Sequence, residues 1–218
     1  MLKCEFGIIS SYGCQVESQE VPATEDQLIF QGLHRMGNGN DDVKVLYFIQ
    51  CTMPRLPRNI NVTFKNIEEL IVTHSKLEII TKLDLQQFEN LKLLSLCGND
   101  LEDLPGDLFE YTRKLENVHF NDNKLKFIGS NLLDGLQELK FVDFKDNVNI
   151  ECYFDLYLDI DDPSRVSFHD LKERIRRDCK PLLDVSENLE GEGSKIPQNL
   201  KQGGQAQGFR YQQRYVDP

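Results

Sequence analysis

The chain has 218 residues, of which 36 are acidic and 25 are basic, so its formal net charge is −11. Nucleic acid and anionic membrane surfaces are therefore poor partners, because both need a concentrated positive charge. No apolar run approaches the roughly 18 residues that would indicate a membrane span.

The first 42 residues are expected to form a cap that precedes a repeating region. The apolar residues that alternate loosely with polar ones are Phe6, Ile8, Tyr12, Cys14 and Val16. With a bend at Gly13, this alternation predicts a β-hairpin. His34 lies between Gly32 and Gly37 without a second histidine at metal-ligand spacing, so we interpret it as a hydrogen-bonding or surface residue.

From residue 43 to residue 150 the apolar positions return every 24 residues. The copies begin at Val43, Ile67, Leu91, Leu115 and Leu139. In the third copy, Leu94 and Leu96 flank Ser95, which is the alternation of a short strand. One such unit cannot bury its apolar edge alone, so we expect the five units to stack and form a continuous parallel sheet.

The ninth position of each copy carries a residue suited to an inward turn. Asn99, Asn123 and Asn147 occupy it in the last three copies, and their amides can satisfy inward-facing backbone groups. We predict that they form a ladder. Ser75 can replace an asparagine only in part, and Cys51 can replace it very little.

After residue 150 the repeat decays, and a helical cap is expected. Ser167 is a suitable N-cap with Asp170 three residues later. Phe168, Leu171 and Ile175 then share one helical face and should close the last repeat. From residue 183 the chain loses periodicity and gains Gln, Gly and Ser, so residues 183–218 are predicted to be a disordered tail.

The period resembles that of leucine-rich repeats, which is about 20–29 residues. It implies an α/β solenoid: a horseshoe with a short parallel sheet on its concave face, an N-terminal hairpin cap and a C-terminal helical cap. The predicted regions are 1–42, 43–150, 151–182 and 183–218, which are the first cap, the five repeats, the second cap and the tail.

Six cysteines allow fifteen pairings. Both ends of a solenoid need a cap, and extracellular solenoids often close theirs with disulfides, so we predict Cys4–Cys14 and Cys152–Cys179. Cys51 is expected to be a buried thiol. Cys97 is left over, either free or as an intermolecular link. A cytosolic protein with reduced thiols is the alternative.

The segment from Cys4 to Val16, the phrase Gly32-Leu33-His34 and the five repeats together resemble the small secreted leucine-rich repeat proteins of insects. The resemblance implies an extracellular protein-binding module with a setting in innate immunity or at the cell surface, and it transfers no catalytic residue or cofactor. The first ten residues lack the apolar segment of a signal peptide. We therefore expect that a signal precedes the sequence as given.

Side chains that point away from the core should line the concave face. We predict that the partner-binding patch consists of Tyr47, Ile49, Ile71, Thr73 and Leu93, extended by Ser95, His119 and Asn121. Its N-terminal rungs are apolar, and an exposed patch of this kind marks a binding site. Alternatively, the cap or a neighbouring loop covers Val45 and Tyr47. A second hypothesis is a structural or adhesion protein that forms a homodimer through the solenoid or Cys97.

Two further features concern a possible catalytic or metal site and a glycosylation site. His119 beside Asp143, with Cys97 on the next rung, could suggest chemistry or a metal, but a solvated polar patch is the preferred interpretation, so we predict neither an enzyme nor a metal site. Asn61-Val62-Thr63 is the one N-glycosylation motif. It should lie on the convex side, where a glycan would not obstruct the concave face.

Overall fold

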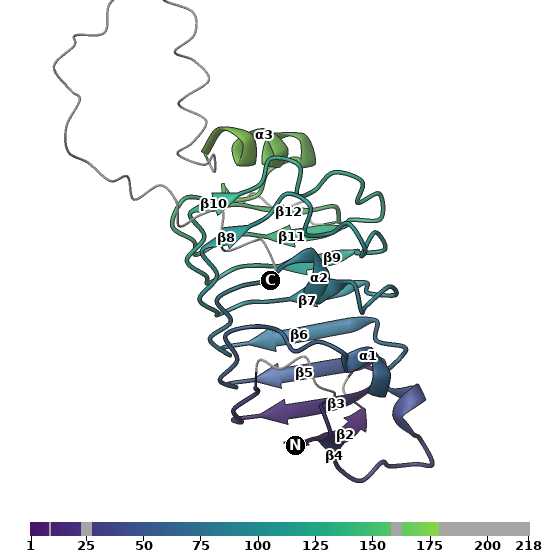
Figure 1. Cartoon of the computed structure of the whole chain (residues 1–218). Helices are drawn as coiled ribbons and strands as arrows, with labels where there is room; N and C mark the ends of the chain where they lie inside the picture. The colour runs from purple at the N-terminus through teal and green to yellow at the C-terminus, as the bar shows by residue number, and fades with distance from the viewer. Residues whose placement is uncertain (9, 23–27, 158–162, 179–218) are drawn as a thin grey trace, which may run out of the picture. The chain divides into compact units, whose positions relative to one another are not determined.

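The computed structural model describes residues 1–8, 10–22, 28–157 and 163–178. Within this part of the chain, short strands stack side by side into an eight-stranded sheet with the order β12-β11-β9-β7-β6-β5-β3-β2 (Figure 1). The predicted tail lies outside the described residues. No helix of the described ranges is long and apolar enough to cross a membrane.

Each predicted repeat contributes one strand to this sheet. The five repeat strands are β5 (Val45–Ile49), β6 (Glu69–Thr73), β7 (Leu93–Ser95), β9 (Asn117–His119) and β11 (Phe141–Asp143). Neighbours pair in parallel with a register offset of 24 residues, so that Leu70 lies beside Leu94 and Leu94 beside Val118. The predicted leucine-rich repeat solenoid is confirmed.

The core lies between the sheet and the return segments of the repeats. Leu70, Leu94 and Val118 are fully buried on the inner face of the sheet. Phe120 stacks on Phe144 of the next rung with ring centroids 5.6 Å apart. The return segments contain α1 (Ile60–Thr63), α2 (Lys82–Leu85), β8 (Asp103–Leu104) and β10 (Phe127–Ile128), and β8 pairs in parallel with β10.

The predicted ladder of inward asparagines is confirmed. The Oδ1 atom of Asn99 accepts the backbone N–H groups of Ser75 and Leu77, at 2.9 and 3.2 Å. Its Nδ2 group donates to three carbonyls, including those of Val72 and Leu96. Asn123 and Asn147 repeat this arrangement one and two rungs later.

The residue before each ladder position adopts a left-handed backbone conformation. These residues are Gln50, His74, Gly98, Asp122 and Asp146, with φ between 50° and 68°. Most side chains are strained in this region, whereas glycine and, to a lesser extent, aspartate tolerate it. The turn therefore has the same shape in every rung, although only one rung uses glycine to make it.

The N-terminal cap extends the repeat sheet by two strands. β2 (Glu5–Ile8) and β3 (Tyr12–Glu17) form the predicted antiparallel hairpin, and β3 pairs in parallel with β5 as an additional rung. The predicted bend at Gly13 is wrong, because Gly13 lies inside β3 and pairs with Gly7. A disulfide joins Cys4 to Cys14. β1 (Leu2–Lys3) pairs with β4 (Phe30–Gln31), and a short 3-10 helix, η1 (Asn40–Asp42), leads into the first repeat.

At the other end, β12 (Tyr153–Asp155) pairs antiparallel with β11, and α3 (Phe168–Asp178) follows. The backbone N–H of Asp170 donates to the Ser167 hydroxyl at 3.1 Å, which is the predicted N-cap. Leu171 and Ile175 are buried, as the helical stripe predicts. Cys152 is buried too, but Cys179 lies outside the described residues, so their pairing stays a prediction.

The second position of each repeat carries a charge whose sign alternates from one rung to the next. These residues are Lys44, Glu68, Lys92, Glu116 and Lys140. The Glu68 carboxylate pairs with Lys44 at 2.9 Å and with Lys92 at 2.7 Å, and Glu116 pairs with Lys140. Opposite charges on neighbouring rungs attract each other, so this row supports the observed stacking of neighbouring repeats.

Candidate functional site

The register of the sheet collects the predicted partner-binding residues on one face. Tyr47 lies beside Ile71, Ile71 beside Ser95, and Ser95 beside His119 along one row. The remaining members of the patch are Ile49 and Thr73, which pair with each other, and Leu93 and Asn121. Strand pairing with an offset of one repeat thus brings together residues that are 24 apart in the sequence.

The predicted exposure of this patch is wrong at Tyr47, which is only 9% exposed, while its neighbour Val45 is fully buried. The tip of the cap hairpin lies over this end of the sheet, where the Ser10 hydroxyl donates to the Glu69 carboxylate at 3.0 Å. A Cβ atom at Gly13 would lie 2.8 Å from the Val45 carbonyl oxygen, so the cap strand packs closely there.

The other seven predicted residues are half-buried, and they define the surface called here the central patch. They are Ile49, Ile71, Thr73, Leu93, Ser95, His119 and Asn121. The central patch is apolar at its N-terminal end and polar at its C-terminal end. Such a surface can bury aliphatic side chains of a partner and offer hydrogen bonds beside them.

His119 lies at the polar end of the central patch. Its ring centroid is 4.8 Å from that of Phe141 on the next rung. Burial lowers the pKa of His119, although the nearby Asp143 carboxylate opposes this shift. The side chain is therefore a neutral imidazole over most of the physiological range and can both donate and accept a hydrogen bond.

Asp143 is mostly buried on the rung beside His119, and its Oδ1 atom accepts the backbone N–H of Lys145 at 2.9 Å. Burial raises the pKa of the Asp143 carboxyl. Among the described residues no group of three His, Cys, Asp or Glu side chains is placed to hold a metal ion. These two residues are explained by packing and local hydrogen bonding.

The two cysteines inside the repeats occupy different environments. Cys51 is buried at the ladder position, and its Sγ atom lies 3.5 Å from the Val16 carbonyl oxygen. Cys97 is half-buried, and its pKa is raised by burial and by the Asp122 carboxylate. A raised pKa makes the Cys97 thiol less reactive than an exposed cysteine at neutral pH.

Asn61 lies in α1 on a return segment, with its side chain exposed. A hollow of about 370 Å³ lies beside it, lined by residues that include Arg58, Leu83 and Glu89. The position is separate from the central patch, because return segments and outward strand side chains lie on opposite sides of the core.

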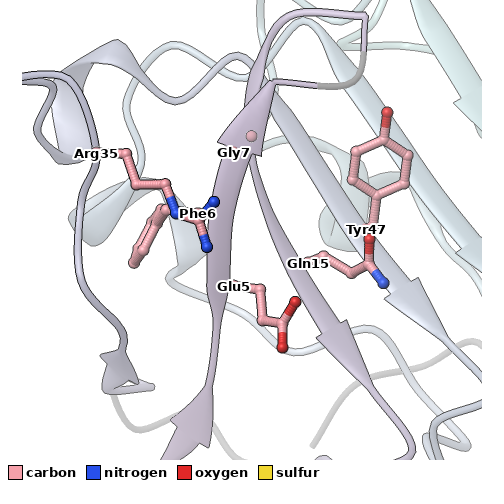
Figure 2. A pocket seen from close by; sticks show the side chains of 7 residues that line it. Glu5, Phe6, Gly7, Gln15, Arg35 and Tyr47 are labelled. Atoms are coloured by element: carbon pink, nitrogen blue, oxygen red, sulfur yellow. The ribbon is translucent and has the colours of Figure 1, made fainter.

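A second hollow, of about 160 Å³, lies at the N-terminal end of the concave face. Figure 2 shows Glu5, Gln15 and Tyr47 in a row across β2, β3 and β5, with Arg35 reaching in from a loop on the other side of β2. Gly7 pairs with Gly13 and leaves the floor without side chains. No sequence signal marks this hollow, because only the strand pairing reveals that the two glycines are neighbours.

A family model described as leucine rich repeat matches residues 89–148. Over 114 residues the chain is 28% identical to human Toll-like receptor 8, a match that spans 49% of this chain and 11% of that receptor. The matched half of the chain thus spans about a tenth of the receptor's length.

Solved leucine-rich repeat structures are also similar. A chain of the LRIM1/APL1C complex is 19% identical with a TM-score of 0.47, over 67% of this chain and 31% of its own length. The APL1 leucine-rich repeat domain is 21% identical with a TM-score of 0.45, over 67% and 42%. A chain of the Toll–Spatzle complex from Drosophila is 18% identical with a TM-score of 0.44, over 52% and 15%.

Proposed function

We propose that this leucine-rich repeat solenoid binds another protein outside the cell, and that the central patch on its concave face makes the contact. The observation that carries the proposal is the register of the sheet, which aligns Ile71, Ser95 and His119 on one outward row. Stacked repeats of this kind create the extended concave surfaces that solenoids use for binding.

The chemistry of the central patch supports a protein partner. Ile49, Ile71 and Leu93 are half-buried aliphatic side chains on three successive rungs, and Asn121 and neutral His119 follow them with hydrogen-bonding groups. Protein interfaces combine an apolar centre with a polar rim in the same way. We therefore expect a partner that presents an aliphatic or aromatic side chain opposite Ile71.

The proposed location outside the cell is supported by the Cys4–Cys14 disulfide, since disulfides persist in oxidising compartments. The partial similarity to a Toll-like receptor supports a recognition role at the cell surface or in innate immunity. Under the same proposal Asn61 carries an N-linked glycan on the convex side. Secreted protein and its Asn61→Gln variant should then differ in intact mass by one glycan, and equal glycan content would contradict this assignment.

The binding proposal is tested with the full chain as bait for extracellular proteins, captured by chemical cross-linking and identified by mass spectrometry. The test variant carries Ile71→Glu and Leu93→Glu on the central patch. The matched control carries Leu83→Glu, which adds a carboxylate at an exposed aliphatic position on α2 of the return side. We expect the test variant to lose at least about tenfold in capture, because an unpaired charge must be desolvated in the contact.

Unchanged capture by the test variant would contradict the use of the concave face. Equal loss in the Leu83→Glu control would place the contact elsewhere. Circular dichroism of each variant establishes that the repeats remain folded, as expected for substitutions at side chains that are at least partly exposed.

A further inference from the structure

The cap presents a loop that is held rigidly beside the open edge of β2. The two ring nitrogens of His34 hydrogen-bond the Tyr12 hydroxyl at 2.9 Å and the Asn40 side-chain oxygen at 2.8 Å. The His34 ring also lies against Phe6, with centroids 3.9 Å apart. The next backbone N–H, that of Arg35, donates to the same Tyr12 hydroxyl at 3.2 Å. Four contacts thus fix the direction in which this loop points.

The same loop exposes apolar side chains on either side of Arg35. Leu33 is 88% exposed and Met36 is 83% exposed, and Ile8 on the adjacent strand is 62% exposed. Met36 also adopts a left-handed conformation, with φ of 60°, that a side chain rarely occupies without support. Aliphatic side chains held out in this way by a rigid loop are typical of a contact surface.

Two opposite charges, those of Arg35 and Glu5, line the hollow at this end of the sheet. Within the described part of the chain, the Arg35 guanidinium and the Glu5 carboxylate make no ion pair or side-chain hydrogen bond, with each other or with other groups. Both residues are exposed. The floor between them is open, because a Cβ atom added at Gly7 would meet nothing within 4 Å.

We propose that this surface of the cap joins two copies of the chain about a twofold axis, so that Arg35 of each copy binds Glu5 of the other. A twofold interface must be self-complementary: if one residue contacts a second across it, the second contacts the first. A patch with one unpaired cation, one unpaired anion and aliphatic side chains meets this requirement. The hollow then receives the guanidinium of the second copy, and Leu33 and Met36, which flank Arg35 in the loop, accompany the two charge pairs.

The pairing goes beyond the proposed binding function and leaves most of the central patch free. Its residues lie in the cap, whereas Ile71 and Leu93 are two and three rungs further along the sheet. A dimer would carry two copies of the central patch, which raises the apparent affinity for a partner that is itself multivalent.

Sedimentation velocity of the full chain over a wide concentration range tests the proposal without knowledge of any other partner. We expect a monomer–dimer equilibrium. Arg35→Glu and Glu5→Arg should each weaken the dimer at least about tenfold, because each creates two repulsive contacts across the axis. The double variant with both substitutions should restore dimers, and an equimolar mixture of the two single variants should form a mixed dimer.

The matched controls are Arg174→Glu on α3 and Glu138→Arg before β11, which change the net charge equally but lie outside the cap. They should leave the dimer unchanged. The effect of Arg35→Glu should shrink between about 0.15 M and about 1 M salt, where the Debye length falls from roughly 8 Å to roughly 3 Å. Leu33→Ser with Met36→Asn should weaken the dimer at both salt concentrations.

A monomer at every concentration would overturn the proposal, as would a dimer that ignores both single reversals or is not restored by the double variant. Failure here is distinguishable from failure of the proposed function. Ile71→Glu with Leu93→Glu should leave the sedimentation profile unchanged, and the Arg35→Glu monomer should still capture a monovalent partner through the central patch.

Discussion

The first two and the last three repeat rungs have the same 24-residue spacing, but different hydrogen bonds stabilise their turns. The Asn99 side chain bonds five backbone groups in the third rung. The Ser75 hydroxyl in the second rung accepts one hydrogen bond and shares its single hydrogen between the carbonyls of Phe48 and Thr73, and Cys51 in the first rung makes weak sulfur contacts. The early strands are longer in compensation: β5 and β6 have five residues, and β7, β9 and β11 have three.

The inward-facing backbone groups of every rung therefore need hydrogen-bond partners, and either strand pairing or a side chain can provide them. The first rung also has the cap strand β3 against it, paired along five residues. The N-terminal rungs therefore depend on the cap, and the later rungs depend on the ladder.

The largest effect is expected from Asn99→Ala. The substitution removes the acceptor of the backbone N–H groups of Ser75 and Leu77, and an unsatisfied buried group costs about 1–3 kcal/mol. The carbonyls of Leu96 and Cys97 keep the Asn123 side chain and the His74 N–H as donors. With partial access of water we expect a loss of about 3–5 kcal/mol in the free energy of unfolding, measured by urea denaturation. Cys51→Ala is the matched variant and should cost about 1 kcal/mol, because sulfur contacts are weak. Equal losses would contradict the difference between the two regions.

The next effect concerns the cap disulfide. Its loop spans a sequence separation of 10 residues, and closing a loop of that length stabilises the folded state by about 2–3 kcal/mol in the chain-entropy description. Reduction, or Cys4→Ser with Cys14→Ser, should lower the free energy of unfolding by that amount. Hydrogen exchange should quicken in β3 and β5 more than in β9 and β11. Uniform acceleration along the sheet would show that the early rungs do not depend on the cap.

The smallest effect is expected at the charge row. Hydrogen bonds from Lys92 and Lys44 lower the pKa of Glu68 below its ordinary value of 4.5. Because the folded-state pKa is the lower one, this stabilisation is complete above pH 4.5 and is lost as the pH falls through the folded-state pKa. Glu68→Gln should cost about 0.5–1 kcal/mol at neutral pH and almost nothing in strong acid, since the pairs are solvent-exposed. A pH-independent difference would show that charge does not contribute.

Much of the solenoid could be predicted from the sequence because its contacts are periodic. Leu70, Leu94 and Val118 occupy equivalent positions of successive copies, so one register satisfies all of them. The charge row was equally readable, since Lys44, Glu68 and Lys92 alternate in sign at one repeat position. It lies outside the apolar and asparagine positions from which the stacking of the repeats is predicted.

The candidate site was predicted less completely. The columns of outward side chains were correctly placed together, but the exposure of Tyr47 was not, because the hairpin tip that reaches Glu69 belongs to no repeat. The binding role of the central patch, the Asn61 glycan and the Cys152–Cys179 pair stay predictions.

The 24-residue period by itself determined the parallel sheet, the inward asparagines and the buried rows. Because the same pattern recurs in every repeat, equivalent residues of neighbouring repeats pack against each other in the same way. Only the tertiary structure decided which side chains the cap covers and that Arg35 and Glu5 line one hollow together with Gly7 and Gly13. Those contacts join a non-repeating loop to a strand about thirty residues away. Their geometry depends on how His34 packs against Phe6 and Tyr12, which no periodicity encodes.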